Sequence, residues 1–217
     1  MASSDTDRSS GKDPEEAILD AAHAVFVRRG TAGARMQEVA DEAGVNKAML
    51  HYYFRNKERL AEAVFRRAAK RLLPPVLTIM GSDAPLEEKV ERVVEHELTI
   101  LSESPYLPAY LLSEMHHHPE RLERLVTATM SGVSPSQLVP PILEKLGRQI
   151  EEGVAEGRLR PITPEQFVIN LVGLCVFPFA ARPLLRLVLG RGEEGFEELM
   201  EERKRTLASF ILGALRP

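Results

Sequence analysis

Apolar residues recur at intervals of three and four along most of this chain, and this spacing limits the fold more than any other feature. After Asp13, for example, the recurring residues are Ile18, Ala21, Ala22, Val25 and Phe26. Such spacing places side chains on one face of an α-helix. No segment shows the sustained two-residue alternation, bounded by turns, that is typical of a β-strand. The sequence therefore predicts an all-α fold.

Start and stop signals divide the chain into helices. Asp13 before Pro14 is a favourable start, and Gly30 is expected to end that helix. Thr163-Pro164-Glu165-Gln166 is a capping box. Pro74-Pro75 is expected to kink or end the helix that precedes it. The expected helices cover residues 14–30, 35–43, 46–54, 56–73, 85–103, 135–157, about 163–190 and 193–215.

Composition sets the class of protein. The single cysteine, Cys175, excludes an internal disulfide and a Cys-based zinc site. The longest apolar run, residues 167–181, is shorter than the ~20 residues that a bilayer requires. The chain opens without a signal-peptide pattern, so a cytoplasmic protein is expected. Residues 1–13 are almost without apolar side chains and are expected to form a disordered tail.

Charge is distributed unevenly. The whole chain carries −4, which argues weakly against nucleic acid. Residues 47–71, however, contain eight Lys or Arg against two Glu. Such a basic stretch is the electrostatic footprint of a phosphate-binding surface, although a solvated helix face would have the same composition.

Two short expected helices joined by Ala43-Gly44-Val45, with a longer helix before them, form the pattern of a helix-turn-helix DNA reader. The second short helix would lie in the major groove, where base edges are legible. Lys47, His51, Tyr52 and Tyr53 supply hydrogen-bond donors and flat rings on it. Lys57 follows at the start of the next helix, where a phosphate would be stabilised by free N–H groups and the helix dipole.

From Ile18 to about Phe65 the sequence resembles the TetR family of bacterial transcriptional repressors. The matching segments are ILDAAHAVFVRRG and EVADEAGVNKAMLHYYFRNKERLAEAVF. The resemblance implies an N-terminal three-helix DNA-binding domain and a C-terminal helical bundle that binds an effector and dimerises. We expect the domains at residues 14–60 and 74–217, joined by a linking helix at about 56–73.

The resemblance also implies which residues contact DNA. Base contacts correspond to Asn46, Lys47, Ala48 and Met49, and the family's aromatic positions that contact the DNA backbone correspond to His51, Tyr52 and Tyr53. The phosphate-contacting lysine corresponds to Lys57, which has no evident packing role in the sequence. The start of the second helix, also near DNA in the family, corresponds to Arg35 and Gln37. This chain departs from the family at Ala34, where a Ser or Thr N-cap is usual. Met49 and Tyr53 could instead pack inside the domain.

The C-terminal half is expected to form a homodimer and to enclose a small-molecule pocket. The helix from Thr163 is apolar nearly all round, and the last helix adds an apolar stripe, so two helices per subunit could form the interface. A two-fold dimer would read a palindromic operator. The candidate pocket walls, which could equally be plain core, are Tyr106, Tyr110, Met115, Phe167, Cys175 and Phe177.

Two alternatives remain at this point. A helical enzyme or metal carrier could use His96 with His116-His117-His118, but adjacent helical histidines point about 100° apart. No P-loop, dinucleotide fingerprint or nucleophile elbow is present, so no cofactor, catalytic residue or metal ligand is assigned. A DNA-binding architectural protein without an effector is the other alternative. The family resemblance favours a ligand-responsive repressor.

Overall fold

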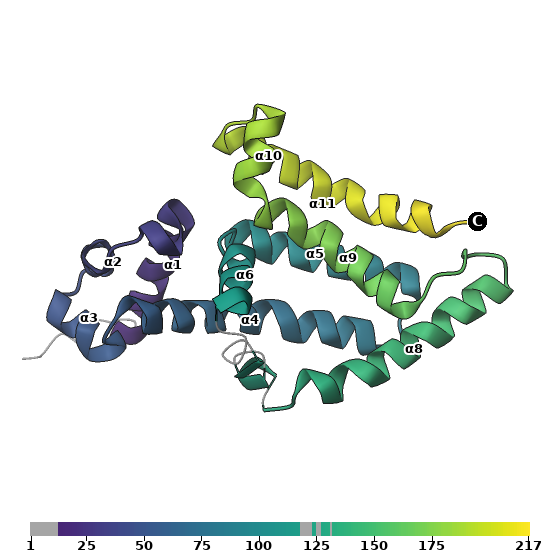
Figure 1. Ribbon diagram of the computed structural model, residues 1–217, viewed down its shortest axis with the longest axis horizontal. Helices are drawn as coiled ribbons and strands as arrows, with labels where there is room; N and C mark the ends of the chain where they lie inside the picture. Colours follow the sequence, from purple (N-terminus) through teal and green to yellow (C-terminus); the bar gives the residue numbers. More distant parts are fainter. Residues whose placement is uncertain (1–12, 118–122, 125–126, 131) are drawn as a thin grey trace, which may run out of the picture. The chain divides into compact units, whose positions relative to one another are not determined.

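The computed structural model describes residues 13–117, 123–124, 127–130 and 132–217. Within these ranges all regular structure is helical and no strand occurs, which confirms the all-α prediction (Figure 1). Contacts divide the chain into two compact units that meet between Phe65 and Arg66. This boundary falls inside α4 (Lys57–Gly81), so one continuous helix contributes to both units. All but the last residue of the expected N-terminal tail lie outside the described residues.

The first unit consists of α1 (Pro14–Gly33), α2 (Met36–Ala43), α3 (Lys47–Phe54) and the start of α4. The Asp13 carboxylate accepts a hydrogen bond from the Glu15 backbone N–H at 3.2 Å and caps α1 as expected. Gly30 has a non-helical backbone with a φ of 67° and breaks α1 where the sequence predicted its end, and one further turn follows to Gly33. The core that holds the unit together is fully buried and comprises Ile18, Ala22, Val25, Phe26, Val39, Ala40, Leu50, Leu60, Val64 and Phe65.

Helix α4 passes through Pro74 and Pro75 and ends at Gly81, so the expected end at residue 73 was wrong. Each proline removes one backbone donor from the helix. The carbonyls left without a helix donor are those of Lys70 and Arg71, and the Arg71 carbonyl contacts His96 Nε2 instead, at 3.0 Å. A donor from another helix thus allows α4 to continue where the sequence signal predicted a break.

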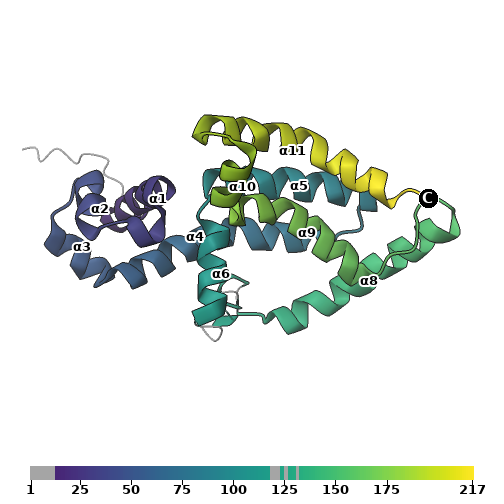
Figure 2. The ribbon, with the colours of Figure 1, turned by 45° about the horizontal axis from the view of Figure 1, so that its top comes forward.

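The second unit continues with α5 (Leu86–Glu103), α6 (Leu107–His117), α8 (Pro135–Ala155), α9 (Pro164–Ala180), α10 (Arg182–Leu189) and α11 (Glu193–Leu215). Helix α5 is central and packs against both α9 and α11 (Figures 1 and 2). Thr163 caps α9 by accepting from the Gln166 N–H at 3.3 Å, as the sequence predicted. Prolines 140 and 141 lie inside α8 without ending it.

The expected single helix at 163–190 is instead two helices. Helix α9 ends at Ala180 and α10 starts at Arg182, at an angle of 74°. Pro183 has no N–H to continue the α9 hydrogen-bond ladder, but it is well suited to the first turn of a new helix. No single described helix is long and apolar enough to cross a membrane, and α9 with α10 passes that test only as this bent pair.

Candidate nucleic-acid interface

The turn between α2 and α3 is closed by Gly44. Its φ of 66° lies in the left-handed region that glycine adopts at little cost. The N–H of Val45 then bonds to the Ala40 carbonyl at 3.0 Å. On either side of the turn, Val39 and Leu50 are buried. These contacts hold the two helices in one fixed arrangement.

The first turn of α3 presents the predicted base-reading residues to solvent. Asn46 caps the helix, since its Oδ1 accepts from the Met49 N–H at 2.8 Å. This bond occupies the Asn46 oxygen and leaves its amide N–H groups as donors. Lys47, Ala48 and Met49 are exposed. Leu50, and not Met49, therefore packs inside the domain.

The end of α3 combines one exposed and one half-buried tyrosine. Tyr52 is 82% exposed, which is unusual for so large an aromatic side chain. Tyr53 is half-buried, and its ring meets that of Tyr52 edge to face, with centroids 5.4 Å apart. Phe54 is buried. The three aromatic rings thus run in order from the buried Phe54 through Tyr53 to the exposed Tyr52.

Arg55 adopts a strained turn after α3. Its φ of 46° is rare for a residue with a side chain, and the Phe54 carbonyl accepts from the Asn56 N–H across it. His51 braces this turn, because its Nδ1 lies 2.8 Å from the Arg55 carbonyl oxygen. Since a carbonyl only accepts, Nδ1 carries the hydrogen. The sequence carried no signal for this turn, since Arg has no preference for positive φ.

Lys57 has a structural contact that the sequence did not reveal. Its Nζ donates to the Ala32 carbonyl at 2.8 Å and to the Ala34 carbonyl at 3.2 Å. The ammonium therefore ties the segment between α1 and α2 to the start of α4. The expectation that Lys57 has no packing role was wrong.

The start of α2 also differs from the expected one. Arg35, not Ala34, occupies the N-cap, and Ala34 is buried. The Glu38 carboxylate accepts from the Arg35 backbone N–H at 3.1 Å and so stabilises the helix start. Arg35 and Gln37 are both exposed, and Gln37 Nε2 donates to Asp41 at 2.8 Å.

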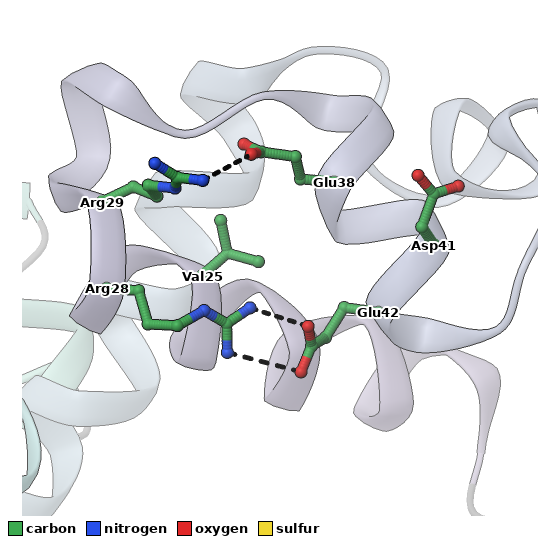
Figure 3. Close-up of a pocket in the computed structure, with 6 residues that line it drawn as sticks. All are labelled: Val25, Arg28, Arg29, Glu38, Asp41 and Glu42. Carbon is green, nitrogen blue, oxygen red and sulfur yellow. Dashed lines mark hydrogen bonds and ion pairs between the residues drawn. The ribbon is translucent and has the colours of Figure 1, made fainter.

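A shallow pocket of about 400 Å³ between α1 and α2 is lined by charges that already pair with one another (Figure 3). Arg28 donates to Glu42 through both terminal guanidinium nitrogens, the shorter contact being 2.7 Å. Arg29 lies 3.7 Å from Glu38. These pairs fasten α2 to α1, so we assign the pocket a bracing role.

The basic stretch at 47–71 is divided between the two units. In the first unit, Lys47, Arg55 and Arg59 are exposed. In the second, Arg71 pairs with Glu103 at 2.6 Å. The net positive charge predicted from sequence is therefore partly used within the second unit.

The six candidate pocket residues of the second unit do not share one environment. Tyr106, Phe167 and Cys175 are buried, and burial raises the pKa of Tyr106 to about 12. Tyr110 is half-buried. Phe177 is 60% exposed, so it does not line an interior with the other residues. The side chain of Met115 lies outside the described residues.

Sequence analysis missed Glu97, a buried acid on α5. It is 3% exposed, and desolvation raises its pKa to about 7, opposed by a hydrogen bond from Cys175. The signal was available, because Glu97 occupies the inward position between Val93 and Leu101 in the helical repeat.

The histidines form no metal cluster among the described residues. His96 Nε2 contacts the Arg71 carbonyl at 3.0 Å. His116 is exposed. The side chain of His117, and all of His118, lie outside the described residues.

Comparisons with known proteins match this architecture. Residues 18–64 match the family described as bacterial regulatory proteins, tetR family, and residues 83–217 match the tetracyclin repressor-like C-terminal domain. The HTH-type transcriptional regulator RutR of Escherichia coli K12 is 26% identical over 206 residues, covering 94% of this chain and 91% of RutR. The HTH-type transcriptional repressor SCO4008 of Streptomyces coelicolor is 24% identical, covering 92% of this chain and 97% of SCO4008.

Solved structures share the fold. HlyIIR, a hemolysin II transcriptional regulator, has a TM-score of 0.52 and 23% identity, covering 94% of this chain and 97% of its own. The fatty acid degradation regulator FadR of Bacillus halodurans has a TM-score of 0.57 and 19% identity, covering 96% of this chain and 99% of its own.

Proposed function

Because this chain belongs to the TetR family of bacterial regulatory proteins and is a ligand-responsive DNA-binding repressor of transcription, we propose specific residues and helices for each part of that task. Residues 14–60 read DNA, and the part of the chain after residue 74 binds an effector and dimerises. Helix α4 links these two parts, and it extends to Gly81 instead of ending at residue 73. Like other members of a family of transcriptional regulators, the protein acts on the chromosome and thus in the cytoplasm.

The observation that carries the proposal is the exposed surface of α3. Lys47, Ala48 and Met49 face solvent on the first turn of a capped helix, where side chains reach base edges in the major groove. The lysine can donate to guanine O6 or N7, and the methyl and thioether groups suit a thymine methyl. The Asn46 amide adds donors at the same end. These four residues are the proposed base contacts.

Contacts to the phosphate backbone come from the residues that surround α3. Tyr52 projects a hydroxyl from an exposed ring, and Tyr53 supports it. His51 holds its Nδ1 hydrogen on Arg55, so only Nε2 remains for a phosphate. Lys57, Arg35 and Gln37 complete the proposed set, with Lys57 donating one hydrogen beyond the two bonds it already makes.

The proposed homodimer face lies on α9, α10 and α11. Ile169 and Phe177 on α9 and Phe210 on α11 are large apolar side chains exposed to solvent. The sequence predicted one apolar stripe on the last helix, made of Phe196, Leu199, Met200, Leu207, Phe210, Ile211 and Ala214. Only part of it faces one way, since Phe196, Met200, Leu207 and Ile211 are buried whereas Phe210 and Ala214 are exposed.

Helix α10 provides the strongest support for this face. Its charged side is turned inward: Arg182 and Arg186 pair with Glu193, and Arg182 lies over the Phe196 ring at 5.3 Å. Its apolar side is exposed, with Leu187 at 79% and Leu184, Val188 and Leu189 each above half. A helix that turns its charges inward and exposes its leucines needs a partner to cover it. In the proposed homodimer, a second copy of this chain would cover this apolar side of α10 together with the exposed side chains of α9 and α11.

The test is selection of bound duplexes from a random DNA pool with the full-length protein. We expect enrichment of a palindrome whose half-sites lie one helical turn or a multiple of it apart. Lys47→Ala should change the preferred bases, whereas the control Glu16→Ala, far from α3 in sequence, should select the same palindrome. Binding without any enriched sequence would instead support an architectural protein.

A further inference from the structure

Three helices of the second unit bring one polar cluster into their interior. Glu97 on α5 lies near Cys175 on α9, and their side chains share a hydrogen bond. Both residues are buried. The second carboxyl oxygen of Glu97, Oε2, has no hydrogen-bond partner within the described residues. The cluster therefore contains an acceptor that the protein itself leaves unsatisfied.

The surroundings of this oxygen are apolar. Val93 and Leu101 lie one turn before and after Glu97 on α5, and Leu171 and Phe179 flank Cys175 in the same way on α9. All four are buried. An ionised carboxylate in such surroundings is costly unless a donor or a cation reaches it.

The cation that acts on Cys175 is bound to a backbone carbonyl. Arg203 on α11 donates through Nε and Nη2 to the Leu174 carbonyl, at 3.3 and 2.8 Å. It acts on the Cys175 thiol, whose pKa it lowers slightly against the larger effect of burial. Desolvation and the hydrogen bond from the thiol are the causes that set the pKa of Glu97. Glu97 thus lacks a balancing charge that a ligand could supply.

We propose that Glu97 is the anchor for a small effector that carries a protonated nitrogen on an apolar body. The nitrogen would donate to Oε2 and balance the carboxylate, while the Cys175 thiol keeps the other oxygen. A charge-assisted bond of this kind is about twice as strong as a neutral one. The apolar body would lie against the side chains of α5 and α9.

The assignment extends the proposed function by naming the class of effector. Its effect on DNA binding rests on that proposed function. Helices α9 and α11 carry the proposed dimer face, and both pack on α5, the helix of Glu97. A ligand inserted between α5 and α9 favours a different position of α9. The effector would then alter the spacing of the two DNA-reading units by population shift.

The test uses the full-length protein and three probes of equal size: benzylammonium, benzyl alcohol and benzoate. Calorimetry at a pH of about 8 would follow binding at millimolar concentrations. We expect benzylammonium to bind wild type at least about tenfold more tightly than the other two probes. Glu97→Gln should lose this preference. The control Glu91→Gln removes an exposed charge from the same helix and should keep it.

A second measurement does not depend on the variant folding. Carbon-13 NMR of the wild-type glutamate carboxyls should show one group that titrates near neutral pH, and benzylammonium should move that titration to lower pH while benzoate should not. The proposal is overturned if benzylammonium fails to bind, if it binds Glu97→Gln equally well, or if this titration does not move. If the cation binds Glu97 but DNA binding is unchanged, the site stands and its role as effector site is wrong. Failure to select any operator would refute the proposed function independently.

Discussion

His96 on α5 donates from Nε2 to the carbonyl oxygen of Arg71 on α4, at 3.0 Å. In an uninterrupted helix that carbonyl would accept from the N–H of residue 75. Residue 75 is a proline and has no N–H, so the imidazole supplies the missing donor. This relationship explains how α4 continues through two prolines, and it binds α4 to α5.

His96→Ala should therefore destabilise the protein by about 1 kcal/mol, because it leaves a helix carbonyl unsatisfied. Urea unfolding would measure this change. The matched control is the same substitution in a Pro75→Ala background, where the new N–H can serve the Arg71 carbonyl. The cost of losing His96 should be smaller there. Equal costs in both backgrounds would show that His96 does not replace the donor absent from Pro75.

Much of the fold was predictable because the helix signals are local. The Asp13 and Thr163 caps form the hydrogen bonds that their spacing predicts. The end of α4 was not predictable, because the donor that rescues it lies on another helix, far along the chain. The break at Pro183 was missed for a related reason: whether a proline ends a helix depends on what surrounds it.

The candidate site shows the same division. The exposure of Lys47, Ala48 and Tyr52 follows from the helical repeat and could be anticipated. The contact of Lys57 with the Ala32 and Ala34 carbonyls joins segments more than twenty residues apart and left no local trace. The unsatisfied oxygen of Glu97 likewise depends on three helices meeting.

Glu97 should make stability depend on pH. Its pKa rises from an ordinary 4.5 to about 7 on folding, with desolvation as the main cause. The folded state then binds more protons between these values, so stability falls as pH rises through that range. Glu97→Gln removes this dependence, and its stability relative to wild type should increase by about 3 kcal/mol from low pH to above neutrality. Urea titrations across this range would measure the difference, and a constant difference would contradict the assignment.

Replacing Arg55 with glycine should relieve the strained turn after α3. Arg55→Gly relieves a φ of 46° and should stabilise the first unit by about 1 kcal/mol. Because it also removes an exposed charge near α3, it should weaken DNA binding. Arg55→Ala removes the same charge without relieving the backbone, so it should weaken DNA binding without the gain in thermal stability. Thermal unfolding that ranks the two variants equally would exclude strain at this position.

The exposed face of α10 should control the oligomeric state. Leu187→Glu places a charge at the most exposed apolar position of that helix and should shift the protein toward monomer in analytical ultracentrifugation. Leu112→Glu changes an exposed leucine on α6 and should leave the dimer intact. Circular dichroism would check that both variants keep their helices. A fully dimeric Leu187→Glu protein would remove α10 from the interface.

Lys57 should have two separable roles. Lys57→Ala removes the bonds to the Ala32 and Ala34 carbonyls and should lower thermal stability. If the ammonium also contacts a phosphate, the same variant should bind all operator sequences more weakly, and the slope of log affinity against log salt should fall by about one. The comparison is Lys47→Ala, which should alter base preference and leave stability unchanged, because Lys47 is exposed. Both slopes should be measured well below the unfolding temperature. A Lys57→Ala protein that is less stable but keeps the wild-type salt slope would show that the ammonium serves the backbone alone.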